Sequence, residues 1–338
     1  MKQQKIMEQQ EPITLDERIK RDLTELYRIL HTPAQLKNIK DVPGIPAAVE
    51  LSKELYSGDK KHKDDDSYAL STIGLPGYFT GNREAQTVMV MLNPGISAME
   101  NDNPLRTMKS IKDLEIDLDN GVDEFIDSYI KKNRKFGEHK SYKVDAFDLK
   151  QAVFLSQWKN TGVDIPDKFI ELLKENHRKK GDTKTQNKIK VVIQNVLTQK
   201  LQLELIPYAS RQFPNIGAKK FSCLFPYLET VLYEIFHIKE CESVIFCSNF
   251  FERLFKAYAK EKNKYFEIVL DEKNPASESE SDDAHCTLVK ITYNGQTKPA
   301  IIAHTFSSQS LTNAYEKMQK YGKQCYKNLN PYLSKENQ

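Results

Sequence analysis

Apolar residues along the chain repeat with the period of an α-helix in several segments. In residues 14–30, leucine and isoleucine recur every three or four positions, and Thr14 with Glu17 provides a capping box at the start. The same criterion predicts further helices over residues 47–58, 105–135, 143–160, 164–200, 221–238 and 250–262, and at the C-terminus. Residues 73–82 contain three glycines and a proline and are predicted to form a loop.

A second kind of apolar segment is short and mostly apolar on both faces, which is typical of buried strands. Such runs occupy residues 87–92, 201–210, 242–249 and 300–303, and helical segments separate them. This alternation predicts an α/β fold with a central, mainly parallel four-stranded sheet flanked by helices. Residues 264–270 and 285–294 flank an acidic segment and predict an extra β-hairpin.

The order of these elements suggests how the chain is divided. Residues 1–72 are expected to form an N-terminal helical extension, residues 73–330 the α/β domain, and residues 331–338 a tail. Between the first two predicted strands, residues from about 101 to 200 form a long helical insertion.

The composition fits a chain with a sizeable buried core: of 338 residues, 39% are hydrophobic and 29% are charged. The sequence has no run of about 18 apolar residues that would predict a membrane span. Residues 1–20 lack the apolar core of a signal peptide, so we expect a cytoplasmic protein that does not contact membranes. The five cysteines contain no CxxC pair, so we expect free thiols and no metal site.

Charge is distributed unevenly along the chain, although the net charge is only +3. Residues 101–130 carry eight acidic and three basic side chains, whereas residues 131–200 carry 17 basic and eight acidic ones. A basic segment of this kind is typical of proteins that bind a polyanion such as a nucleic acid. It also fits a solvated, lysine-rich helical surface, and charge alone does not separate the two interpretations.

Polar residues follow the predicted strands where the strands end. Ligands of a parallel sheet flanked by helices bind beyond the carboxyl ends of its strands. Asn93 follows the first strand in the sequence Asn-Pro-Gly, and His304 follows the last. The Asn93 amide can orient a water, and a neutral His304 can donate to a developing anion. If the two strands are parallel neighbours, both side chains face one crevice; each residue is also compatible with a purely structural role.

The motifs at these two positions, taken in order, resemble those of the uracil-DNA glycosylase superfamily. Residues 91–95, Met-Leu-Asn-Pro-Gly, resemble the Gly-x-Asn-Pro-Gly motif of its mismatch-specific and single-strand-selective branches, with methionine in place of the first glycine. Residues 303–311 keep a histidine after an apolar strand, but threonine and phenylalanine replace the proline and serine of the His-Pro-Ser motif. The resemblance covers about residues 73–330 and lacks the cysteine spacing of the iron–sulfur branches.

The resemblance implies a DNA glycosylase that hydrolyses the N-glycosidic bond of a flipped-out uracil or modified base. Asn93 would position the water and His304 would stabilise the leaving base. The substrate-binding residues that it implies are Leu92, Pro94, Gly95, Tyr78, Phe79, Tyr208, Ser210, Asn249 and Ser307. The contacts to the DNA backbone would come from Lys131, Lys132, Arg134, Lys135, Arg178, Lys179 and Lys180. The expected partner is single- or double-stranded DNA, with no cofactor, and the protein is expected to be a monomer.

Three other functions remain compatible with the sequence. The same fold could serve a nucleic-acid-binding protein without turnover, or an enzyme acting on a nucleoside-like small molecule. A structural protein whose basic segment binds an acidic partner is the third. Salt-sensitive DNA binding and the release of a base distinguish the glycosylase from these alternatives.

Overall fold

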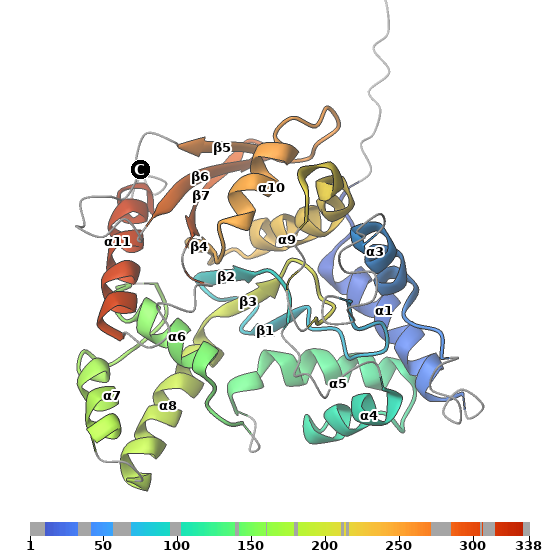
Figure 1. Ribbon diagram of the computed structural model, residues 1–338, viewed down its shortest axis with the longest axis horizontal. Helices are drawn as coiled ribbons and strands as arrows, with labels where there is room; N and C mark the ends of the chain where they lie inside the picture. The colour runs from blue at the N-terminus through green and yellow to red at the C-terminus, as the bar shows by residue number, and fades with distance from the viewer. Residues whose placement is uncertain are drawn as a thin grey trace, which may run out of the picture.

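The structure is a computed structural model that describes residues 11–32, 42–56, 69–94, 103–138, 142–159, 161–178, 182–210, 213, 216–271, 285–304, 306 and 315–333. A mixed β-sheet lies at the centre of these residues, with helices on both of its faces (Figure 1). None of the helices described has the length and hydropathy that crossing a membrane requires.

Within the described residues, the sheet has seven strands in the order β1-β3-β2-β4-β7-β6-β5. The strands are β1 (Phe79–Gly81), β2 (Thr87–Met91), β3 (Leu201–Glu204), β4 (Ser243–Phe246), β5 (Glu267–Asp271), β6 (Cys286–Tyr293) and β7 (Gln296–Ala303). Strand β2 pairs in parallel with β3 and β4, and β4 pairs in parallel with β7. The outer strands β1, β5 and β6 run antiparallel to their neighbours.

The predicted α/β class is confirmed, but the sheet is larger and more mixed than the sequence predicted. Strand β1 lies in the segment that was expected to be a loop, because its three residues pair with β3 despite the glycines around them. The predicted hairpin, β5 and β6, belongs to the same sheet because β6 also pairs with β7. Asn294 and Gly295 connect β6 to β7 with φ angles of 49° and 79°, the left-handed backbone that a tight hairpin turn needs.

One face of the sheet is covered by helices that share a first hydrophobic core. They are α1 (Leu15–Leu30), α3 (Pro46–Tyr56), α4 (Pro104–Asp113), α5 (Val122–Arg134), the 3-10 helix η3 (Ala218–Leu224), α9 (Phe225–His237) and α10 (Phe250–Tyr258). Alternate strand residues such as Val88, Val90 and Ile302 point into this core. Helix α1 begins at the predicted capping box, in which the Glu17 backbone donates to the Thr14 hydroxyl and the Thr14 backbone donates to the Glu17 carboxylate.

The opposite face carries a second hydrophobic core. Its helices are α6 (Ala146–Leu155), α7 (Phe169–Arg178), α8 (Thr183–Gln199) and α11 (Tyr315–Leu333), with the 3-10 helix η2 (Phe136–Glu138) beside α8. Met89 and Met91 of β2 point into this core. Helices α6 and α11 pack closely at Gly322, where an added Cβ would lie 1.9 Å from the Phe154 carbonyl oxygen.

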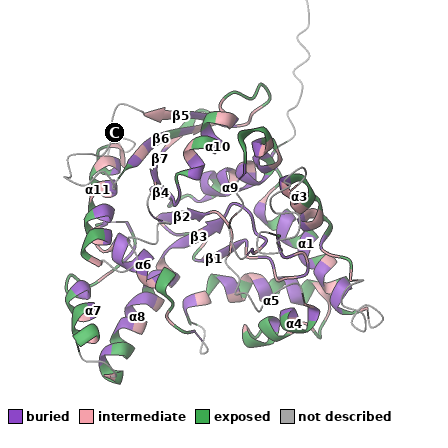
Figure 2. Cartoon of the chain, viewed as in Figure 1, coloured by how far each residue is buried: buried purple, intermediate pink, exposed green. Residues whose placement is uncertain are grey.

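Residues 101–200 contribute to both layers. Helices α4 and α5 join the first core, whereas α6, α7 and α8 join the second. Helix α1, from the predicted N-terminal extension, contacts α5 and α9. Figure 2 shows the result: the central strands are buried, while α4, α7 and α8 expose their outer faces. The predicted extension and insertion thus form part of the layers that cover the sheet.

Candidate functional site at the carboxyl edge of the sheet

Asn93 lies two residues beyond the end of β2, at the carboxyl edge of the sheet, and is half-buried. Its amide nitrogen donates to the Ser210 hydroxyl at 2.8 Å and to the Tyr208 carbonyl oxygen at 3.3 Å. Because a carbonyl oxygen only accepts hydrogen bonds, the Asn93 amide atom that faces the Tyr208 carbonyl must be the nitrogen. The other amide atom of Asn93, Oδ1, is therefore the acceptor. The Ser210 backbone donates in turn to the Pro94 carbonyl at 3.2 Å. The segment after β3 therefore holds Asn93 in one orientation.

The other residues expected next to Asn93 differ in their exposure. Leu92 and Pro94 are half-buried, and Ser210 is only 2% exposed where it meets Asn93. Asn249 directly precedes α10 and is exposed. Two further expected residues, Gly95 and Ser307, lie outside the described residues.

His304 directly follows β7, but its strand is not the neighbour of β2 because β4 lies between them. The imidazole Nε2 lies 2.9 Å from a carboxylate oxygen of Glu252 on α10 and 2.9 Å from the hydroxyl of Thr287 on β6. His304 therefore shares the carboxyl edge with Asn93, but its hydrogen bonds run toward α10 and β6.

The surroundings of His304 decide its protonation. Burial lowers the pKa of His304, and the nearby Glu252 carboxylate only partly opposes this shift. The imidazole is therefore neutral at pH 7, and its single proton belongs on Nε2, which faces the carboxylate. Burial would raise the pKa of Glu252, but the Lys256 ammonium 2.7 Å away and His304 lower it overall. In this arrangement Nδ1 of His304 is an acceptor.

The aromatic residues Tyr78, Phe79 and Tyr208, expected to stack on a base, lie in the first core, each no more than 2% exposed. The hydroxyls of Tyr78 and Tyr208 donate to the same carboxylate oxygen of Asp22, at 2.6 and 2.5 Å. Phe79 packs edge-on against Tyr129. These positions do not fit stacking on a base, because the rings and hydroxyls are already occupied within the protein.

The basic residues at the end of α5 lie near the opposite edge of the sheet. Arg134 and Lys135 line a small surface hollow with Asn82, which precedes β2, and Thr198, which precedes β3. The amino ends of β2 and β3 are therefore nearby, whereas Asn93 lies beyond their carboxyl ends. Two further lysines were expected to contact the DNA backbone. Lys131 lies in the last turn of α5, and the Lys132 ammonium donates to the Glu115 carboxylate at 2.8 Å.

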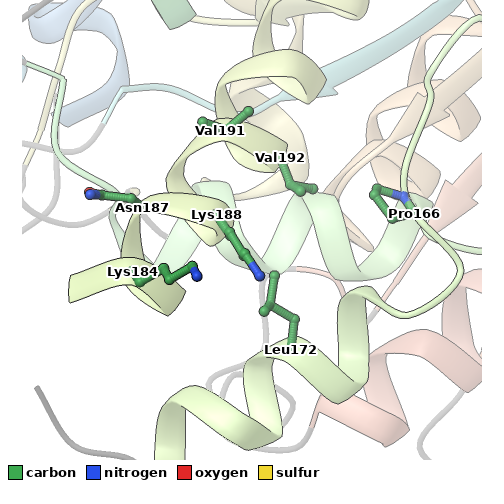
Figure 3. A pocket seen from close by; sticks show the side chains of 7 residues that line it. All are labelled: Pro166, Leu172, Lys184, Asn187, Lys188, Val191 and Val192. Carbon is green, nitrogen blue, oxygen red and sulfur yellow. The ribbon is translucent and has the colours of Figure 1, made fainter. Parts of the chain in front are cut away.

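Arg178 is the last residue of α7, and α8 begins at Thr183. Helix α8 is about 25 Å long and ends directly before the amino end of β3. Lys179 and Lys180 lie outside the described residues. Helices α7 and α8 border a groove of about 750 Å³ with a mainly apolar lining and two lysines (Figure 3). It is lined by Pro166, Leu172, Lys184, Asn187, Lys188, Val191 and Val192.

The structure also contains a row of buried polar residues that the sequence analysis missed. Gln202 and Glu204 of β3 pair in register with Met89 and Met91, so they face the second core. The Lys200 ammonium donates to the Gln202 amide oxygen at 3.2 Å, and the Gln202 amide nitrogen donates to Glu204 at 2.8 Å. Lys200 is 0% exposed and Glu204 is 8% exposed. We refer to Lys200, Gln202 and Glu204 as the polar row.

Burial shifts the pKa values of the ionisable groups in and around the polar row. Burial raises the pKa of Glu204 to about 8, although Gln202 and Lys200 act in the opposite direction. Burial likewise lowers the pKa of Lys200 to about 8, against the attraction of Asp148 on α6. Burial also raises the pKa of Asp148 to about 6 and lowers that of Lys150, a second lysine of α6, to about 8. Perturbed groups of this kind cluster at functional sites.

Two side chains in this region have polar atoms without a hydrogen-bond partner in the described part of the chain. They are Glu204, at one carboxyl oxygen, and Gln151 of α6, at both amide atoms. Buried polar atoms are normally paired, so these side chains are candidates for pairing with a bound water or ligand. The sequence does contain a signal: polar residues stand at every second position of Lys-Leu-Gln-Leu-Glu, which places them on one face of the strand.

The five cysteines are free, as the sequence predicted. The described residues contain no group of three or more His, Cys, Asp or Glu side chains placed to hold a metal ion. Comparison with family models, with curated proteins and with solved structures finds no match to this chain. The candidate site is therefore defined by its geometry alone.

Proposed function

We propose that the protein is a DNA glycosylase that hydrolyses the N-glycosidic bond of a flipped-out uracil or modified base. The orientation of Asn93 carries this proposal. Its amide nitrogen is committed to Ser210 and Tyr208, so Oδ1 is available to accept a hydrogen bond from a water. A fixed acceptor can hold and orient a water for attack on a sugar carbon, and ligands of parallel sheets bind at the carboxyl edge where Asn93 lies.

The strand arrangement supports the uracil-DNA glycosylase-like interpretation of the sequence. Strands β3, β2, β4 and β7 are consecutive in the sheet and pair in parallel. Asn93 and His304 follow the first and the last of these four strands along the chain. The resemblance implies this placement for the residues that position the water and stabilise the leaving base.

His304 would act through Nδ1, because its Nε2 already faces Glu252 and Thr287. Nδ1 donates a hydrogen bond only when the imidazole is charged. Glu252 favours that charged form and burial opposes it, so an approaching negative base would shift the balance toward protonation. The proposed mechanism therefore places the leaving base next to an imidazolium.

An enzyme acting on a nucleoside-like small molecule is the second candidate, and the basic residues favour it. Arg134 and Lys135 lie near the amino ends of β2 and β3, and Arg178 is the last residue of α7. Arg134 and Lys135 are therefore not placed to hold a phosphate beside Asn93. A nucleoside or a free base needs no such contacts, whereas a DNA backbone is normally held by several.

Both candidates are tested by incubating the protein with DNA that carries a panel of damaged and modified bases, and separately with the matching nucleosides. Mass spectrometry then identifies released bases, and alkali treatment reveals abasic sites. Release from DNA, with an affinity for DNA that falls steeply between about 50 and 200 mM salt, supports the glycosylase. Release from nucleosides alone supports the second candidate. No release from either kind of substrate contradicts both.

A further inference from the structure

The hydrogen bonds along the polar row have one fixed direction. Lys200 has only donors, so the Gln202 atom 3.2 Å from its ammonium is the amide oxygen. The Gln202 amide nitrogen must then face Glu204, where it donates to Oε1 at 2.8 Å. Oε1 of Glu204 is thus fixed as an acceptor, and a proton on this carboxyl group belongs on Oε2. Lys200 and Gln202 therefore orient Glu204 for recognition.

Glu204 is a neutral acid with one unpaired oxygen. Its burial raises its pKa to about 8, so the carboxyl group holds its proton at neutral pH. The protonated oxygen, Oε2, has no partner among the described residues. A buried hydroxyl without an acceptor costs free energy that a ligand with a suitable acceptor recovers. Oε1 keeps a second lone pair beside the Gln202 bond, so it accepts a further hydrogen bond.

The register of the sheet places Glu204 near Asn93. Glu204 pairs with Met91, two residues before Asn93 on the same chain segment. In a regular sheet this register separates the Cα atoms of Glu204 and Asn93 by about 8 Å, a distance that one nucleoside bridges. Gln151 lies one helical turn after Asp148, which interacts electrostatically with Lys200. Its buried and unpaired amide adds a second recognition group on the α6 side.

We propose that Glu204 recognises the ligand of this site by pairing its carboxylic acid with an adjacent acceptor and N–H donor on an uncharged ring. Oε2–H donates to the ring acceptor while Oε1 accepts the ring N–H. Oxo bases present this pattern as a carbonyl beside an N–H, and amino bases present it as a ring nitrogen beside an amino group. The proposal rests on the proposed function, since it takes the ligand to be a base bound next to Asn93.

The test measures binding of small rings by titration calorimetry to the folded wild-type protein and to three variants. The probes are 2-pyridone, 2-aminopyridine and N-methyl-2-pyridone, which lacks the N–H. Glu204→Gln keeps a donor and an acceptor, Glu204→Leu keeps neither, and Glu171→Gln on the exposed face of α7 is the matched control. Thermal unfolding of each variant verifies that it is folded.

We expect Glu204→Gln and the control to bind within about threefold of wild type, and Glu204→Leu to lose about 20-fold or more. N-methylation should weaken binding to the wild-type protein by a similar factor. Wild-type affinity should fall between about pH 6 and pH 9, as Glu204 ionises and loses its donor, whereas Glu204→Gln should show no such fall. If the wild-type protein binds 2-pyridone more tightly, the ligand is assigned to the oxo bases. If it binds 2-aminopyridine more tightly, the ligand is assigned to the amino bases.

Equal binding by wild type and Glu204→Leu, or no binding of any probe to the wild-type protein, overturns the role of Glu204. The proposed function fails separately: if the rings bind through Glu204 but no base is released from DNA, the glycosylase is contradicted and the recognition role stands. If Glu204→Leu releases the same bases at the wild-type rate, the recognition role is contradicted and the glycosylase stands.

Discussion

Two groups of buried ionisable residues lie on opposite faces of the sheet, and they differ in how completely they are paired. On the first face, Asp22 accepts hydrogen bonds from the hydroxyls of Tyr78 and Tyr208 and from the Arg21 guanidinium at 2.9 Å. On the second face, the hydrogen bond to Glu204 comes from Gln202, and Oε2 has no partner in the described part of the chain.

The comparison separates a structural group from a candidate binding group. Asp22 and Glu204 are both buried, at 1% and 8% exposure, so burial does not distinguish them. Complete pairing stabilises the fold at Asp22, whereas incomplete pairing at Glu204 leaves a position that a ligand completes. Four substitutions test this distinction through stability.

The largest effect is expected for Asp22→Ala. It removes the acceptor shared by two buried tyrosine hydroxyls and the partner of Arg21, and should lower the free energy of unfolding by about 3 kcal/mol or more. Urea denaturation at pH 7 measures the change, with the exposed Asp119→Ala as the control. A loss below about 1 kcal/mol would show that the Asp22 network is not structural.

The second prediction concerns the pH dependence caused by Glu204. The pKa of Glu204 is about 8 in the folded protein, whereas an ordinary glutamate, as in the unfolded chain, has a pKa of 4.5. Between these two pH values the folded protein therefore holds a proton that the unfolded chain has lost. The contribution of Glu204 to stability therefore falls as pH rises, by about 2 kcal/mol between pH 6 and pH 8. Glu204→Gln should lack this part of the decline, measured by urea denaturation at both pH values. An identical pH dependence in the two proteins contradicts a buried, proton-holding Glu204.

Tyr208→Phe should have a smaller effect. The substitution removes one of the hydroxyls that donate to Asp22 but leaves the ring in the first core. We expect a loss of about 1.5 kcal/mol in the free energy of unfolding. Tyr233→Phe, whose hydroxyl bonds to Glu11 at the surface, is the matched control and should change stability by less than about 0.5 kcal/mol. Equal effects of the two substitutions would refute the importance of the Asp22 network.

The smallest effect, with the opposite sign, is expected for Gln151→Leu. Because both amide atoms of Gln151 are buried and unpaired, replacing the amide with an apolar side chain of similar size should leave stability unchanged or raise it by up to about 1 kcal/mol. Thermal and urea unfolding of the variant measure the difference. A loss of about 2 kcal/mol or more would mean that the amide is paired within the protein.

Local patterns allowed much of the fold to be predicted. The capping box of α1 and the apolar runs of β2, β4 and β7 depend on residues close together in the sequence, and each lies within the element that was predicted, although β7 begins four residues before its apolar run. Strand β1 was missed because its three residues lie among glycines, and its pairing with β3 comes from residues more than a hundred positions away.

The candidate site was predicted less completely because its contacts are long-range. Asn93 was found from its position after a strand, but its partner Ser210 lies 117 residues away. Tyr78 and Tyr208 were interpreted as stacking partners for a base, since their common partner Asp22 is 56 and 186 residues distant. The polar row was missed because residues 201–210 were interpreted as one mostly apolar strand, whereas β3 ends at Glu204 and alternates between apolar and polar positions.

The central claim is that Asn93 orients the water that attacks the glycosidic bond. It is tested most directly by single-turnover base release from the preferred DNA substrate, comparing wild type, Asn93→Ala and the control Asn187→Ala on α8, with DNA affinity measured in parallel. The account predicts that Asn93→Ala releases the base about 100-fold more slowly or worse, at an affinity within about threefold of wild type, while the control is unaffected. Release by Asn93→Ala at the wild-type rate would contradict it.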